Sequence, residues 1–182
     1  MSNVKKICIC ALCVALCYVL PQAFHILPLG TALSPMHLPV LLCGLVCGWP
    51  YGLVCGLLGP VISYLLSAMP PVPVLIPMVP ELGVYGLAAG LGMKFIRTGR
   101  TLLDIYLSLL PALVLGRVAG GVTQALLYLS RTESYTIALW AGSYVVGTLP
   151  AVVLQLVLLP ALVWGLMRAG LIPARYAARP VS

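Results

Sequence analysis

The chain has 182 residues, of which 62% are hydrophobic and 7% are charged, and its ten Lys and Arg against three Asp and Glu give a net charge of +7. A water-soluble domain usually carries about 25% charged residues, so this composition excludes one. The basic residues stand at a few points between apolar runs, which is typical of a membrane protein and argues against a nucleic-acid-binding surface.

Six apolar segments follow one another along the chain, and a membrane-spanning helix needs about 20 such residues. We expect spans at 6–23, 35–48, 51–68, 74–95, 103–129 and 137–167. The first segment is too long for a signal peptide, so we expect a transmembrane helix that is not cleaved off. The second segment is short for a span and is expected to be tilted or to be extended by the loop before it. The sequence therefore predicts an all-α membrane protein, with residues 1–182 forming one compact bundle of six transmembrane helices.

Basic residues predict the orientation of this bundle, because cytoplasmic loops are enriched in Lys and Arg. With the N-terminus inside, one basic residue, Arg131, falls outside and Arg117 falls within the fifth span. The cytoplasmic set is then Lys5, Lys6, Lys94, Arg97, Arg100, Arg168, Arg175 and Arg179. An even number of spans places both termini in the cytoplasm and the proline-rich segment 68–74, which cannot be helical throughout, on the outside.

Two ionisable residues lie at membrane depth, where charge is costly and marks function by default. Glu81 lies in the fourth expected span and Arg117 in the middle of the fifth. Either both face a cavity and contact a polar solute, or they pair with each other or with backbone carbonyls and lock the bundle. A buried guanidinium suits a carboxylate or a phosphate, so ligand contact is favoured for Arg117.

Other polar and aromatic residues are candidates for the same pocket. His37 begins the second span and either binds solute or is satisfied by a loop carbonyl. Uncharged amides within spans are candidates for hydrogen bonds between helices, and they are Gln22, Gln124 and Gln155. Aromatic residues either line a pocket or anchor the interface, and they are Tyr85, Trp140 and Tyr144.

Small residues recur at four-residue spacing, which lets helix backbones approach closely. The pairs are Ala11 with Ala15, Gly44 with Gly48, Gly52 with Gly56, and Gly86 with Gly90. The spacing alone does not distinguish packing inside one bundle from a docking face for another membrane protein. The seven Cys fit neither a disulfide framework nor a zinc site and are interpreted as small apolar residues, so no metal and no cofactor is expected.

Motifs for nucleotide hydrolysis and for hydrolase chemistry are missing, because the sequence contains no Gly-x-x-x-x-Gly-Lys-Ser/Thr, no His-Glu-x-x-His and no Gly-x-Ser-x-Gly. We therefore expect a protein that is not an enzyme. Two alternatives remain: a self-sufficient small secondary transporter or channel, although no inverted repeat is found, and an intramembrane enzyme, although no nucleophile or metal cluster has a recognisable spacing.

Four segments in order resemble the substrate-binding S-components of energy-coupling factor (ECF) vitamin transporters. They are LSPMHLPVLLCGLVCGWPYG at 33–52, GPVISYLLSAMPP at 59–71, PELGVYG at 80–86, and the pair Gly116-Arg117. The resemblance covers about residues 7–167. It implies a six-helix protein of the bacterial cell membrane that captures one vitamin from outside and docks on a transmembrane coupling protein with two ABC-type ATPases.

The resemblance also assigns roles to residues. It implies that Ala11 and Ala15 form the docking face for the coupling protein, and that Met69, Pro70 and Pro71 belong to a lid loop. The branch with Ser-Pro-Met-His and Met-Pro-Pro resembles S-components for pantothenate and for cobalamin. Arg117 would suit the carboxylate of pantothenate, with Glu81 and His37 near its hydroxyls, so we expect pantothenate or a similarly small acid. Tyr85, Gln124, Trp140 and Tyr144 complete the expected binding site.

Overall fold

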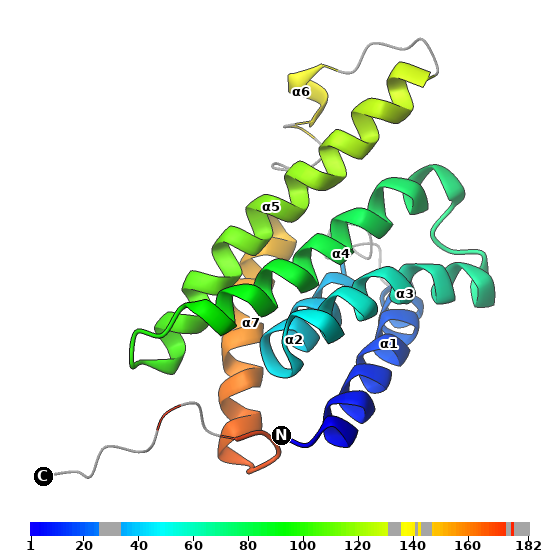
Figure 1. Cartoon of the computed structure of the whole chain (residues 1–182). Coiled ribbons are helices and arrows are strands. Elements are labelled where there is room, and N and C mark those ends of the chain that lie inside the picture. The colour runs from blue at the N-terminus through cyan, green and yellow to red at the C-terminus, as the bar shows by residue number, and fades with distance from the viewer. Residues whose placement is uncertain (26–33, 131–135, 141, 143–146, 174–175, 177–182) are drawn as a thin grey trace, which may run out of the picture.

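A computed structural model of the chain describes residues 1–25, 34–130, 136–140, 142, 147–173 and 176, and the secondary structure in this part is helical throughout (Figure 1). Five helices are long and apolar enough to cross a membrane: α1 (Asn3–His25), α3 (Trp49–Ser67), α4 (Val72–Phe95), α5 (Thr101–Ser130) and α7 (Leu149–Arg168). The prediction of an all-α membrane protein with several spans is therefore confirmed.

The expected second span is a short helix at the centre of the bundle. α2 (His37–Cys47) has 11 residues, about 16 Å of helix, and this is well below the length of a full span. It contacts α1, α3, α4, α5 and α7, and nearly all of its residues are buried. The helix stops at Gly48, whose φ of 96° is in the region that glycine adopts readily. Protein neighbours surround α2 on most sides.

Two sequence-predicted boundaries are wrong. The expected sixth span at 137–167 is not one helix, because the one-turn α6 (Ile137–Trp140) and the later α7 are separate elements. Gly147 donates its N–H to the carbonyl of Gly142, and Pro150 occupies the first turn of α7, a position that tolerates proline. The proline-rich loop is also shorter than 68–74, because α4 begins at Val72 and places Pro73 in its first turn.

Glycines bring α2, α3 and α4 into backbone contact. A Cβ added to Gly86 would overlap the backbone of Gly52, and one added to Gly44 would overlap the carbonyl of Gly86. Gly56 and Gly90 are equally close to the backbones of α4 and α3 respectively. The spaced glycines of these three helices therefore serve packing inside the bundle.

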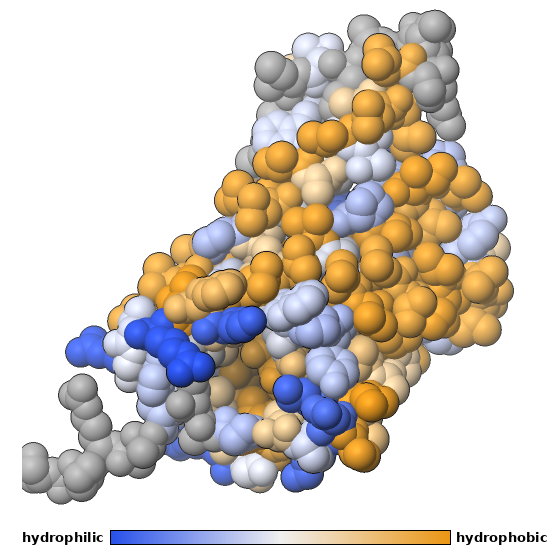
Figure 2. Space-filling view, in the orientation of Figure 1, coloured by the Kyte–Doolittle hydropathy of each residue, from blue (hydrophilic) through white to orange (hydrophobic). Residues whose placement is uncertain are grey.

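α1 presents two different faces. Its buried face carries Cys10, Cys13 and Cys17, which pack with the other buried cysteines, Cys43, Cys47 and Cys55. Its opposite face is exposed and carries both Ala11 and Ala15. Figure 2 shows the wider pattern, in which most of the visible surface is apolar. Strongly hydrophilic residues gather at the lower left, over the connection between α4 and α5 and near the start of α1.

One buried carboxylate organises that hydrophilic end. Asp104, in the first turn of α5, is fully buried and accepts hydrogen bonds from the Thr98 N–H at 2.8 Å and the Thr98 hydroxyl at 2.7 Å. Its second oxygen accepts a hydrogen bond from the Tyr176 hydroxyl. A carboxylate near a helix N-terminus also interacts favourably with the helix dipole. Asp104 thus ties the α4–α5 connection and the chain after α7 to α5.

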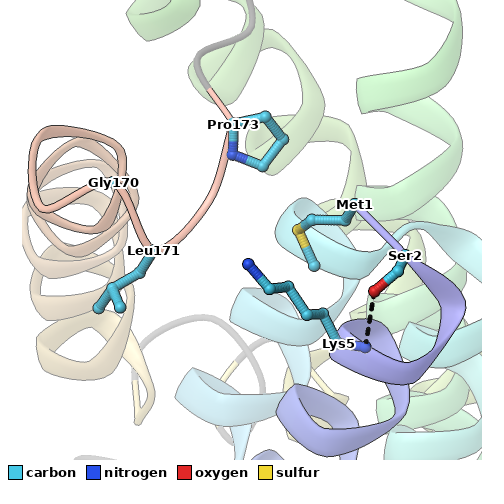
Figure 3. Close-up of a pocket in the computed structure, with 6 residues that line it drawn as sticks. All are labelled: Met1, Ser2, Lys5, Gly170, Leu171 and Pro173. Atoms are coloured by element: carbon cyan, nitrogen blue, oxygen red, sulfur yellow. Dashed lines mark hydrogen bonds between the residues drawn. The ribbon is translucent and has the colours of Figure 1, made fainter.

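An open pocket of about 450 Å³ lies between the start of α1 and the turn after α7. Met1, Ser2 and Lys5 line one side, while Leu171 and Pro173 lie across from them (Figure 3). The Ser2 hydroxyl accepts the Lys5 N–H at 3.4 Å and so caps the first turn of α1. This pocket lies at the same end of the bundle as Asp104.

Candidate solute-binding site

Three polar side chains meet between α2 and α4. Glu81 and Tyr85 are four residues apart on α4 and therefore share a face, and the Tyr85 hydroxyl donates to Glu81 Oε1 at 3.1 Å. His37 Nε2, from the first residue of α2, lies 3.6 Å from the same oxygen. The exposed fractions are 8% for Glu81, 8% for His37 and 1% for Tyr85. These groups form a buried cluster that combines an acid, an imidazole and a phenol.

Ring packing fixes this cluster. The imidazole of His37 meets the Tyr85 ring edge to face, with centroids 5.1 Å apart and planes 65° apart. The other side of Tyr85 packs directly on Gly116 of α5, where an added Cβ would overlap the ring. Glycine at 116 therefore lets α4 and α5 approach closely enough for the phenol ring to fill the space between them. This contact joins the cluster to α5 at the residue before Arg117.

Arg117 is half-buried and is held by groups from two directions. Its Nη2 donates to Thr148 Oγ1, just before α7, at 2.7 Å, and its Nη1 donates to the Leu113 carbonyl at 3.5 Å. Trp140 of α6 packs on Gly121 and donates its indole N–H to the Arg117 carbonyl at 3.4 Å. Leu113 of α5 and Thr148, just before α7, thus hold the guanidinium, while Trp140 of α6 holds the backbone of the same residue.

The structure brings together most of the predicted site residues but not all of them. His37, Glu81 and Tyr85 contact one another, and Arg117 and Trp140 form a second group, which is linked to the first through the packing of Tyr85 on Gly116. Gln124 lies seven residues beyond Arg117 on α5, about 10 Å away on the same helix face. Tyr144 lies outside the described residues. Arg131, the expected outer basic residue, lies outside them as well.

The expected lid loop connects α3 to α4. Met69, Pro70 and Pro71 lie in this short connection, and the Met69 carbonyl accepts a hydrogen bond of 3.0 Å from the buried hydroxyl of Ser63. Ser63 lies one turn before the end of α3, so the base of the loop is fixed to the helix that precedes it.

Three further polar residues were missed or left out of the expected site. Nothing in the sequence marks Thr148 as a partner of Arg117, except that it stands just before a helix with a proline in its first turn. Gln155 of α7 was read as a bond between helices, yet it is buried and its Oε1 has no hydrogen-bond partner among the described residues. Asp104 was overlooked because it stands one residue inside the expected fifth span. In the structure, it serves the opposite end of the bundle.

The chemistry of the site is that of recognition by charge and hydrogen bonds. It offers a guanidinium, a carboxylate, an imidazole, a phenol and an amide, all set in apolar helices. Among the described residues, no group of three or more His, Cys, Asp or Glu side chains could hold a metal ion. A few polar groups among apolar side chains are typical of a small-molecule binding site.

Comparison with protein families gives a match over nearly the whole chain. The model described as "ECF transporter, substrate-specific component" matches residues 5–173. Neither the comparison with curated proteins nor that with solved structures gave a match.

Proposed function

Because the chain belongs to the substrate-specific components of ECF transporters, we propose that it captures pantothenate, or a similarly small acidic vitamin, from outside the cell. Members of this family are substrate-binding membrane subunits of transporters and are not enzymes. They work in a membrane-embedded complex with a coupling protein and ATPases. What we propose beyond the family is the identity of the solute and the residues that bind it.

The observation that carries the proposal is the position of Arg117. Its guanidinium sits in an apolar helix, and Thr148 holds one of its nitrogens from the side. A guanidinium has five N–H donors in a planar fork that matches a carboxylate in two parallel hydrogen bonds. Thr148 and the Leu113 carbonyl accept from part of this fork. In the proposal, the carboxylate of the solute binds at this guanidinium.

The remaining groups suit the hydroxyls and the amide of pantothenate. Glu81 and His37, which meet at Glu81 Oε1 beside Tyr85, would accept or donate hydrogen bonds to these groups. Trp140 and Gln124 lie on the side of Arg117, Tyr144 is proposed as a further contact from the sequence alone, and the loop with Met69, Pro70 and Pro71 is proposed to cover the solute. Cobalamin is much larger and would need a wider mouth.

The exposed face of α1 is proposed to dock on the coupling protein. Ala11 and Ala15 are exposed, whereas the spaced glycines of α2, α3 and α4 are used for packing inside the bundle. Small residues let a partner helix approach closely. In the proposed orientation the basic end of the bundle, with Lys5, Lys6 and Arg168, faces the cytoplasm.

Tryptophan at the α1 face is expected to stop transport and to spare binding. Ala11→Trp and Ala15→Trp add bulk on a face that contacts no other helix among the described residues, so the fold should tolerate them. Uptake of labelled pantothenate by cells that also produce the coupling protein and ATPases should fall to background, while affinity in detergent stays within about twofold. Val153→Trp, at an exposed position of α7, is the matched control. Uptake that survives both alanine variants would remove the docking assignment.

The experiment that tests the proposed function is a binding screen. The purified chain in detergent is heated with each of a panel of water-soluble vitamins, and the unfolding midpoint is recorded. A bound solute at a thousandfold excess over its Kd stabilises the folded state by about 4 kcal/mol. We expect pantothenate to raise the midpoint and the other vitamins not to do so. A midpoint raised by a different vitamin would correct the solute, and no shift across the panel would reject the proposal.

A further inference from the structure

The pocket between the start of α1 and the turn after α7 combines one cation with apolar walls. Its volume of about 450 Å³ is within the usual range for sites that bind small molecules. Figure 3 shows the Lys5 side chain extending from α1 into the space between α1 and the turn, where Leu171 and Pro173 lie. The side chain of Met1 flanks the same space. A ligand in this pocket would therefore meet an ammonium group and an apolar surface together.

The ammonium group of Lys5 has no acidic partner among the described residues. The structure describes two acidic side chains, Glu81 and Asp104, and both are buried and engaged elsewhere. Glu81 lies against His37 inside the bundle, and Asp104 accepts hydrogen bonds from Thr98. A negatively charged ligand would give Lys5 the counter-charge that this part of the chain does not supply.

Other basic residues gather at the same end of the bundle. Figure 2 shows strongly hydrophilic residues over the α4–α5 connection and near the start of α1. The described basic residues of this end are Lys5, Lys6, Lys94, Arg97, Arg100 and Arg168. Asp104 is the one described carboxylate among them. Their summed charge attracts anions to this end of the protein, and the pocket gives an anion a place to bind.

The pocket lies at the level of the lipid headgroups. α1 and α7 are both long and apolar enough to cross a membrane, and the pocket lies where α1 begins and just beyond the end of α7. In either orientation this is where a span leaves the hydrocarbon layer. Val4, Ile7 and Leu171, near the pocket, are all more than half exposed. A soluble anion would use Lys5 alone, whereas a phospholipid also covers this apolar surface.

We propose that the pocket binds the phosphate of an anionic phospholipid, with Lys5 as its counter-charge and the acyl chains against the exposed apolar side chains beside it. Basic pockets between transmembrane helices are a recurrent way of binding anionic headgroups. α1 and α7 make little direct contact with each other, so a lipid in this pocket joins the first long helix to the last one. The site is separate from the solute-binding residues and does not depend on which solute the protein binds.

The test measures lipid binding to the purified chain in detergent by native mass spectrometry. The probes are phosphatidylglycerol, which is anionic, and phosphatidylcholine with the same acyl chains, which is zwitterionic. We expect the wild type to prefer phosphatidylglycerol, and Lys5→Gln to weaken its binding about fivefold while phosphatidylcholine binding is unchanged. Lys94→Gln is the matched control: it removes the same charge from the same end but outside the pocket, and it should change phosphatidylglycerol binding less than twofold.

Three results would overturn the proposal. Equal losses for Lys5→Gln and Lys94→Gln would show attraction by the overall charge of this end without a site in the pocket. Equal binding of the two lipids by the wild type would show that the headgroup charge is not recognised. Displacement of phosphatidylglycerol from the wild type by a tenfold molar excess of glycerol 3-phosphate, roughly one log unit of competition, would make the pocket a site for a soluble phosphate. We expect no such displacement, because the soluble anion lacks the acyl chains.

Discussion

Replacing Arg117 by alanine is expected to lower the affinity for pantothenate about 100-fold or more. Losing one partner of a desolvated, hydrogen-bonded charge pair costs about 2–5 kcal/mol, because the carboxylate of the solute would then be buried without a counter-charge. The bundle itself should remain folded, since Thr148 lies at the start of α7 and can bind water once the guanidinium is gone. Isothermal titration in detergent measures the affinity, and the unfolding midpoint of the empty protein confirms folding.

Two further arginine variants separate charge from geometry. Arg117→Lys keeps the positive charge but loses the planar fork, so its affinity should fall between those of the wild type and Arg117→Ala. Arg168→Ala removes a basic residue that stacks on Trp164 at the other end of α7, with the guanidinium carbon 3.9 Å from the ring centroid, and binding should not change. An affinity of Arg117→Ala equal to that of the wild type would make Arg117 a structural residue.

Replacing Gly86 by alanine is expected to destabilise the protein by about 3 kcal/mol, a large effect for one methyl group. The added Cβ would overlap the backbone of Gly52. A flexible side chain could move aside, but a helix backbone cannot, so α3 and α4 must separate along their contact. The free energy of unfolding in a mixed-detergent titration, or the thermal midpoint, measures the loss.

Gly165 provides the matched control for that substitution. It lies within α7, and a Cβ added there would meet nothing within 4 Å. Gly165→Ala should leave stability unchanged or raise it by up to about 1 kcal/mol, since alanine favours a helix more than glycine does. Equal effects at Gly86 and Gly165 would show that the α3–α4 contact is looser than the structure has it.

The sequence predicts the long helices well because a lipid bilayer imposes a length that any apolar segment must meet. Five of the six expected spans correspond to helices long enough to cross a membrane. Length alone says nothing about what surrounds a helix, however. α2 is short and packs against five helices, and one of its close contacts is between Gly44 and Gly86, which lie 42 positions apart in the chain. Spacing could not show that these glycines face each other.

The charged residues of the candidate site could be predicted from the sequence. Glu81 and Arg117 stand out in apolar segments, and the structure places each in a hydrogen-bonded setting. The family resemblance placed His37 in the same site as Glu81, but Thr148 was not predicted as a partner of Arg117, because it comes from an element far away in the sequence. Gln155 had the signal of a polar residue in an apolar run, but a hydrogen bond to another helix explains such a residue equally well. In the part of the chain that the structure describes, its Oε1 makes no such hydrogen bond.

The distribution of the seven cysteines also makes the protein convenient to label. All seven are free thiols, and Cys8 is exposed while the other six are buried. Cys8 lies three residues before Ala11, on the same side of α1, so a thiol-reactive fluorophore would attach beside the proposed docking face without any engineered cysteine. The native chain thus carries its own reporter position, and arrival of a partner helix at α1 could be followed as quenching or energy transfer in real time.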